Sequence, residues 1–136
     1  MSKGNTFEND VVLLTFNGTA FSWNANTNLF VSLHTADPGE AGTQTTSEAT
    51  YTSYARVTVA RTAGGFTVTG NSVANTALVQ FPQCTGGTNT VTHFAVGTVT
   101  SGVGQILYKG ALNASLAVSN GIQPQFAAAA LTVTED

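Results

Sequence analysis

The segment LFVSLHTADPGEAG, residues 29–42, decides the fold. Up to His34 its apolar side chains alternate with other side chains, which is the period of two expected of a strand with one mainly apolar face. The strand ends at Asp37-Pro38-Gly39. Proline fixes φ and donates no hydrogen bond, aspartate can bond to the backbone ahead of it, and glycine accepts the positive φ of a tight turn. We therefore expect the rest of the chain to follow as strands that start from this turn.

Strand-like segments separated by Gly and Asn make up most of the remaining chain. Alternation is clearest in YARVTVAR, and Gly64-Gly65, Gly70-Asn71 and Asn120-Gly121 are the strongest turn signals. The expected strands after the first are residues 54–61, 66–69, 72–81, 91–98, 105–109, 111–118, 122–126 and 127–134. About eight short strands at this spacing predict an all-β fold, an antiparallel β-sandwich or jelly roll. A small closed barrel requires the same alternation and stays open as an alternative.

One helix is expected near the N-terminus, from Thr6 to Asn17. Thr6 can cap its start, and Gly18 fits the position just past its end. Its apolar side is expected to hold Phe7, Val11, Leu14 and Phe16. The β-branched residues of this segment would also suit a strand. At 136 residues the chain fits one domain, which we expect to be a single β-sandwich over residues 1–136 with an N-terminal helical arm.

Charged residues make up only 8% of the chain, against about 25% in ordinary domains. The polar surface must therefore consist of Thr, Ser, Asn, Gln and backbone, which costs little to desolvate. Together with the apolar side of the helix, this composition predicts a homo-oligomer, a trimer or a dimer. The four basic residues are scattered and the net charge is −3, so nucleic acid is not an expected partner.

Neither membrane insertion nor redox chemistry is expected. No window approaches 18 apolar residues, and the N-terminus lacks the basic head and long apolar run of a signal peptide. We therefore expect a soluble protein made in the cytosol. The single cysteine, Cys84, cannot pair within the chain and is interpreted as an unreactive thiol in a reducing cytosol or as a lightly buried apolar filler.

The side chains that could perform catalysis do not form a convincing constellation. Ser32, His34 and Asp37 are the ingredients of a hydrolytic triad, but a Ser and a His two residues apart on a strand lack the elbow that a nucleophile needs. His34 and His93 with nearby acids could hold a metal, yet their spacing is not that of a ligand set. Glu40 and Glu48 could be paired glycosidase acids, but both fall in a long loop that is expected to be mobile. We predict no enzyme activity, no cofactor and no metal.

The long connection from Thr35 to Thr50 shows no apolar periodicity. A structureless loop of that length in a compact domain usually has a function, and contact with a partner is the commonest one. We expect this loop, with Met1 to Thr6, to contact neighbouring subunits. The alternative is that the loop covers an open end of the sandwich. The candidate residues for the turn and the partner contact are His34, Asp37, Pro38, Gly39, Glu40 and Gly42.

Several segments resemble a family of small virion proteins from tailed bacteriophages. They are LHTADPGEAGTQTTSEATY with YARVTVAR, then VTHFAVGT, GALNASLAVSNGIQPQF and the terminal LTVTED. Members of this family commonly carry tail-fibre labels, and some similar small proteins are capsid decoration or cement proteins. The resemblance implies a non-enzymatic structural protein of the virion, synthesised in the host cytoplasm, and it supplies no catalytic residues.

Three functions remain open within these expectations. A cement protein would bind the outer surface of the shell, contact the major capsid protein and stabilise capsomer contacts, and the absence of a shaft-like repeat favours this placement. A tail fibre or minor tail component would contact tail proteins instead. A carbohydrate-binding module would use exposed Trp23, Tyr51 and Tyr54.

Overall fold

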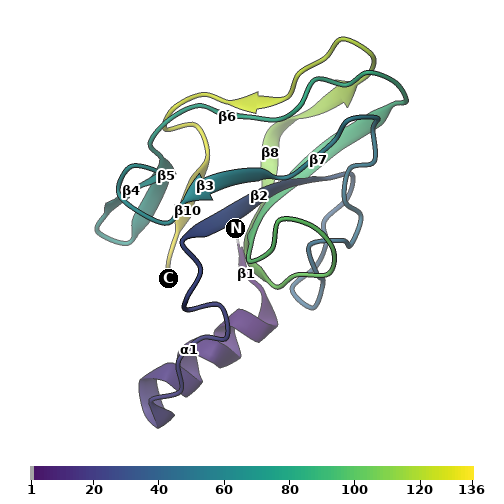
Figure 1. The fold of residues 1–136 in the computed structure, drawn as a ribbon. Helices are drawn as coiled ribbons and strands as arrows, with labels where there is room; N and C mark the ends of the chain where they lie inside the picture. Colours follow the sequence, from purple (N-terminus) through teal and green to yellow (C-terminus); the bar gives the residue numbers. More distant parts are fainter. Residues whose placement is uncertain (1) are drawn as a thin grey trace.

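Two β-layers face each other across one apolar core, and a helix projects from one end of them (Figure 1). The computed structural model describes residues 2–136. Its elements are β1 Ser2–Lys3, α1 Asn5–Asn17, β2 Asn28–His34, β3 Val57–Ala60, β4 Phe66–Thr69, β5 Ser72–Asn75, β6 Val79–Gln80, β7 Asn89–Gly97, β8 Ile106–Val118, β9 Gln125–Phe126 and β10 Thr132–Thr134. Helix α1 is too short to cross a bilayer, and the rest of residues 2–136 contains no helix that could do so.

The first layer is a five-stranded antiparallel sheet in the order β1-β8-β7-β2-β3. Strand β2 confirms the predicted first strand, and it lies between two neighbours, with Val31 opposite both Val57 and Val96. Its last four residues are all buried, although successive side chains of a strand point to opposite faces of the sheet. The sequence pattern had indicated one buried face, but the loop that follows β2 covers its second face as well.

The second layer consists of a three-stranded sheet, β10-β5-β4, and a two-stranded sheet, β6-β9. The core between the layers includes Val31, Leu33, Val59, Val79, Phe81, Val91, Phe94, Val96, Leu131 and Val133. Each sheet described in residues 2–136 ends in edge strands and does not close on itself. The structure is therefore the predicted antiparallel β-sandwich and not a closed barrel.

Strand β8 differs from the prediction, which divided it at Gly110. It runs without a break from Ile106 to Val118, and Gly110 lies opposite the buried Phe94 of β7. The register shifts elsewhere, between Val96 and Gly97 and between Val91 and His93. At the second shift Val91 pairs with Leu116 but His93 pairs with Ala111, so β8 bulges between these two pairs. This lone glycine in a strand pattern thus lies within a continuous strand and does not mark a turn.

The last predicted strand, residues 127–134, is shortened to β10 by the side chain of Asn75. Its Oδ1 accepts the N–H of Leu131 at 2.9 Å, and its Nδ2 donates to the carbonyls of Ala77 and Ala127 at 2.8 and 2.9 Å. Between these hydrogen bonds, from Ala127 to Leu131, the chain forms a turn in which Ala129 has φ 64°. The same residue ends β5, which explains why the predicted strand 72–81 is divided into β5 and β6.

Helix α1 confirms the expected helix but begins one residue earlier. Gly4 is the N-cap residue, and no side chain caps the helix, so the predicted cap at Thr6 is wrong. Gly18 ends the helix as predicted, at φ 66°, and donates its N–H to the carbonyl of Leu13. Before the helix, Ser2 and Lys3 pair with β8, and Lys3 also forms an ion pair with Glu135 near the C-terminus. Met1, which was expected to contact a partner, lies outside the described residues.

Replacing Asn75 with alanine should lower the free energy of unfolding by about 2–3 kcal/mol. The substitution leaves one buried N–H and two carbonyls without their partner, and each unsatisfied buried group costs about 1–3 kcal/mol. Urea denaturation measures the change. The control is Asn113→Ala, at an exposed position of β8, which should change stability by less than about 0.5 kcal/mol. Equal losses for the two variants would contradict this role of Asn75.

Candidate functional site

The loop from Thr35 to Thr50 is held against the end of the five-stranded sheet. Thr35 donates its N–H to the carbonyl of Ser47 at 2.8 Å, and Ala49 donates to the carbonyl of Leu33 at 2.8 Å. The loop therefore returns beside β2 as an irregular hairpin. The expectation that it is mobile is wrong, because polar side chains beneath it tie it to the sheet.

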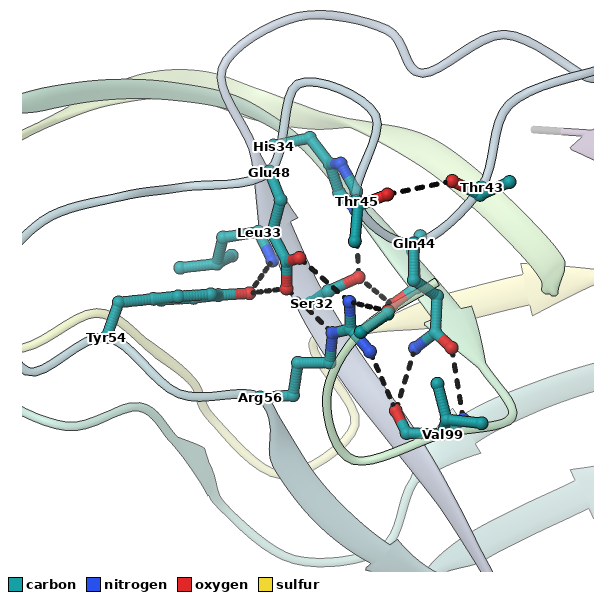
Figure 2. A network of polar contacts seen from close by, with 12 residues as sticks. Ser32, Leu33, His34, Thr43, Gln44, Thr45, Glu48, Tyr54, Arg56 and Val99 are labelled. Atoms are coloured by element: carbon teal, nitrogen blue, oxygen red, sulfur yellow. Dashed lines mark hydrogen bonds and ion pairs between the residues drawn. The ribbon is translucent and has the colours of Figure 1, made fainter. Parts of the chain in front are cut away.

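An ion pair between Glu48 and Arg56 forms the centre of these ties, as Figure 2 shows. Arg56 Nε and Nη2 donate to the two carboxylate oxygens at 2.7 and 2.8 Å, and the Arg56 side chain is only 2% exposed. The guanidinium also donates to the carbonyls of Val99 and Gly102 at 3.0 and 2.8 Å. All three nitrogens of the guanidinium are thus bonded, and one arginine joins the loop to the 98–105 connection. In YARVTVAR, Arg56 alternates with the apolar Ala55 and Val57, so the sequence pattern gave no sign of its burial.

Tyr54 attaches the same carboxylate to β2. Its hydroxyl donates to Glu48 Oε1 at 2.9 Å and accepts the N–H of Leu33 at 3.1 Å (Figure 2). Burial is the main reason that the pKa of this hydroxyl lies far above its ordinary value, so Tyr54 stays a donor. Glu48 is therefore fixed in a structural network, and it is not placed as one of two paired catalytic acids.

Gln44, at the far side of the loop, is fully buried. Its side-chain amide forms hydrogen bonds with backbone groups of the connection after β7. Its Oε1 accepts the N–H groups of Thr98 and Val99 at 3.1 and 3.0 Å (Figure 2). Room for this side chain comes from Gly97 and Gly104, where an added Cβ would lie 2.1 and 2.0 Å from Gln44 atoms. The alternative interpretation in the sequence analysis, a loop that covers an open end of the sandwich, matches this arrangement.

The predicted triad ingredients do not come together. Ser32 and His34 are hydrogen-bonded, Oγ to Nε2 at 2.8 Å, but neither is exposed to solvent. His34 Nδ1 donates to the carbonyl of Thr46 at 2.8 Å, a proton placement assigned from the carbonyl acceptor, so no carboxylate orients the ring. Burial, foremost, lowers the pKa of His34 below its ordinary value. Asp37 lies elsewhere, on the surface, bonded to Lys109.

The two histidines do meet, although they lie 59 positions apart in the sequence. His34 of β2 and His93 of β7 are directly opposite in the sheet register. Both ring nitrogens of His34 are bonded to protein atoms, and His93 Nδ1 is bonded to the hydroxyl of Thr92 at 2.8 Å. Within residues 2–136 no group of three or more His, Cys, Asp or Glu side chains is arranged to bind a metal.

The turn residues predicted as contact candidates position helix α1. Gly39 has φ 74° and donates its N–H to Asp37 Oδ1 at 2.8 Å, while Pro38 is buried. The N–H of Gly39 and, after it, Lys109 lower the pKa of Asp37. The carbonyl of Glu40 then accepts the N–H of Asn5 at 2.9 Å, the first residue of the helix.

Two glycines allow this close approach of turn, helix and sheet. A Cβ at Gly42 would lie 2.0 Å from the carbonyl oxygen of Pro38, and one at Gly4 would lie 2.4 Å from that of Ile106. Gly4 also donates its N–H to the carbonyl of Leu107 at 3.1 Å. The turn and β8 together hold the first turn of α1 by its backbone.

Aromatic rings complete the base of the helix. Phe7 is buried against Phe21, Trp23 and Tyr108, and Phe21 and Trp23 are stacked with centroids 4.7 Å apart. Through these contacts Phe21 and Trp23 hold the loop after the helix against the helix base. Arg61 lies over the Trp23 ring at 4.8 Å, and Trp23 is only 9% exposed.

The expected sugar-binding rings are therefore not a surface platform. Trp23 is covered, Tyr51 is buried with its hydroxyl bonded to the carbonyl of Pro82 at 2.8 Å, and burial raises the pKa of Tyr51 to about 12. Tyr54 is part of the Glu48 network. Their exposure, on which the carbohydrate-binding interpretation depended, was predicted wrongly.

The far half of α1 presents large apolar side chains to solvent. Phe16 is 80% exposed and Val12 is 55% exposed. The prediction placed Phe16 on the same side as Phe7, but nine residues along a helix amount to two and a half turns and bring it to the opposite side. Counting the helical angle would have found this outer side from the sequence.

Comparison with protein families matches residues 2–134 to the family described as "Podophage GP4 fiber I protein gp80". A search of curated proteins finds no match.

Arg56→Met should lower the free energy of unfolding by about 3 kcal/mol or more. The substitution leaves the carboxylate of Glu48 without its cation in a mostly buried place, and breaking one side of a buried pair typically costs about 3–5 kcal/mol. The control, Lys3→Met, removes the more exposed pair with Glu135, whose side chains are 24% and 42% exposed, and should cost less than about 1 kcal/mol. Similar losses in the two variants, measured by chemical denaturation, would show that the buried pair has no special weight.

Stability should decrease as the pH falls below about 6.5, the ordinary pKa of histidine. Because the pKa of His34 is lower in the folded protein, the unfolded chain binds the proton more tightly, and acid favours unfolding. The stabilisation that neutral His34 contributes is fully present above pH 6.5, and it is lost as the pH falls from that value to the pKa of His34 in the folded protein. His34→Gln should flatten this part of the plot of unfolding free energy against pH. The control is His93→Gln, because His93 lies opposite His34 in the sheet and is only half-buried, and this variant should keep the slope. A profile that keeps its slope in His34→Gln would assign the dependence to another group.

Proposed function

The chain belongs to the family described as podophage GP4 fiber I protein gp80, and on this premise we propose that it is a non-catalytic structural subunit of a virion fibre. The match confirms the expected resemblance to virion structural proteins of phages and includes the N-terminal helix, which the resembling segments did not cover. The protein is thus a phage structural protein of the virion, which associates with other virion components.

The observation that carries this proposal is the family match over almost the whole described chain. The geometry agrees with a structural role, because the candidate catalytic groups are used for folding. Ser32 and His34 are buried, and Glu48 is bonded to Arg56 and Tyr54. A catalytic group must reach its substrate, and these three do not face an open site.

Within this proposal, residues 1–136 act as one unit, a β-sandwich body with an N-terminal helical arm. Within the body, polar groups of the loop 35–50 form hydrogen bonds with the rest of the body and tie the loop to the sheet. The arm leaves Phe16 and Val12 open, and large exposed apolar side chains beside each other are typical of a contact surface. We place a contact with neighbouring virion subunits on the arm, with the turn of Asp37 to Gly42 as its support.

Capsid decoration is the second candidate, with the major capsid protein as partner. It is favoured by the scarcity of charge, 8% of the chain, because an uncharged polar surface is cheap to desolvate against a large shell. In that case the exposed Thr and Ser residues of loop 35–50 would contact capsomers. The family description favours the fibre.

Labelling of intact phage particles distinguishes the two placements. Antibodies against the sandwich body should label a fibre in electron micrographs, and the protein should be present in far fewer copies than the major capsid protein. Label spread over the shell, with a copy number comparable to that of the capsid protein, would contradict the fibre proposal and favour decoration. Particles stripped of fibres provide the control, since they should lose the label.

A further inference from the structure

The outer side of helix α1 carries a stripe of four exposed residues. Asn5, Asn9, Val12 and Phe16 are all exposed, and they follow one another at intervals of four, three and four residues. This spacing averages about 3.5 residues and keeps the four side chains in one line along the helix. The stripe thus has the period of a coiled-coil seam over the full length of the helix.

The opposite side of α1 is already used by the protein's own body. Phe7 is buried against the aromatic rings at the helix base, and Asp10 accepts a hydrogen bond from Gln105 Nε2 at 2.9 Å. Val11 packs against the same aromatic group. The orientation of α1 about its axis is therefore fixed, and the outer stripe faces away from the sandwich. Figure 1 shows the helix projecting from the end of the two layers.

We propose that this stripe is a contact between copies of the chain, in which α1 helices pack side by side and parallel, with Asn9, Val12 and Phe16 each next to its equivalent in the neighbouring copy. The chemistry of the stripe is what a self-contact requires. It contains no charged residue, so no like charges are brought together by symmetry. An amide can both donate to and accept from a second amide, so Asn9 can pair with its own copy.

The position of Asn9 also favours the parallel arrangement. The stripe contains two asparagines, Asn5 and Asn9, and register is specified because any shift along the stripe places at least one amide against an apolar side chain. In the parallel register Asn9 meets Asn9 and Phe16 meets Phe16. Glu8, which flanks the stripe, then lies beside the uncharged Leu13 of the copy. An antiparallel pair would place Asn9 against Val12.

The size of the stripe limits its strength. A 13-residue helix is about 20 Å long, and one face of it buries much less than the roughly 1,200 Å² of a stable interface. The contact is therefore weak in dilute solution and forms where copies are held at high local concentration. It rests on the proposed function in this respect, since a virion structure supplies that concentration.

Cysteine cross-linking tests the seam directly. Asn9→Cys and Val12→Cys place one thiol on the stripe, while Leu14→Cys, on the body side of α1, and Val103→Cys, in an exposed loop, are matched controls. The native Cys84 is 1% exposed and should not react. Concentrated protein is oxidised, and disulfide-linked dimers are measured. The two stripe variants should cross-link several-fold more than the two controls, and adding Phe16→Glu should remove the difference.

The orientation is read from mixtures of the two stripe variants. Parallel helices predict links of residue 9 to 9 and of 12 to 12 in each pure variant, whereas antiparallel helices predict links chiefly of 9 to 12 in the mixture. Cross-linking that is equal at stripe and control positions, or absent from both, overturns the self-contact, and a dominant 9-to-12 product overturns the parallel arrangement. The purified protein is used, so these results are independent of whether the particles carry the chain on a fibre or on the shell.

Discussion

The buried ion pair of Glu48 and Arg56 is the contact on which the shape of the 35–50 loop depends. Removing two charges from water is costly, and the pair repays this cost only because every nitrogen of the guanidinium has a partner and the carboxylate also accepts from Tyr54. Such a pair adds little net stability compared with an apolar core, but it permits only one arrangement of the chain around it. The loop therefore has a single conformation although it contains almost no apolar side chain.

A few hydrogen bonds connect the loop to helix α1. The loop starts at His34 and passes the Asp37 turn, whose next residue, Glu40, accepts the first N–H of α1. Gln44 fastens the other part of the loop to the 98–105 connection, which leads into β8, and β8 also binds the backbone of Gly4. The helix thus projects from a base that is fixed on two sides. A fixed base suits an arm that must present one side to a neighbour and the other to its own body.

Local signals in the sequence were sufficient for the sandwich class, for strand β2, for the Asp37 turn and for Gly18 at the helix end, because each depends on neighbouring residues only. The sequence could not indicate the contacts that join distant segments. Arg56 occupies a position with the period of a solvent-facing side chain, and its burial depends on Glu48 and two remote carbonyls. Asn75 resembles an ordinary turn residue, but it shortens a strand more than 50 positions later. Phe16 is different, since the helical angle alone would have placed it correctly.

Hydrogen exchange at single amides tests most directly whether the buried pair holds the loop and the helix base together. The N–H groups of Thr35, Ala49 and Asn5 are bonded across the loop and the turn. In the native protein they should exchange slowly, close to the rates of β2. In Arg56→Met, under conditions where the sandwich remains folded, all three should exchange faster together while β7 stays protected. Fast exchange of these amides in the native protein, or loss of protection at Ala49 alone in the variant, would contradict the account.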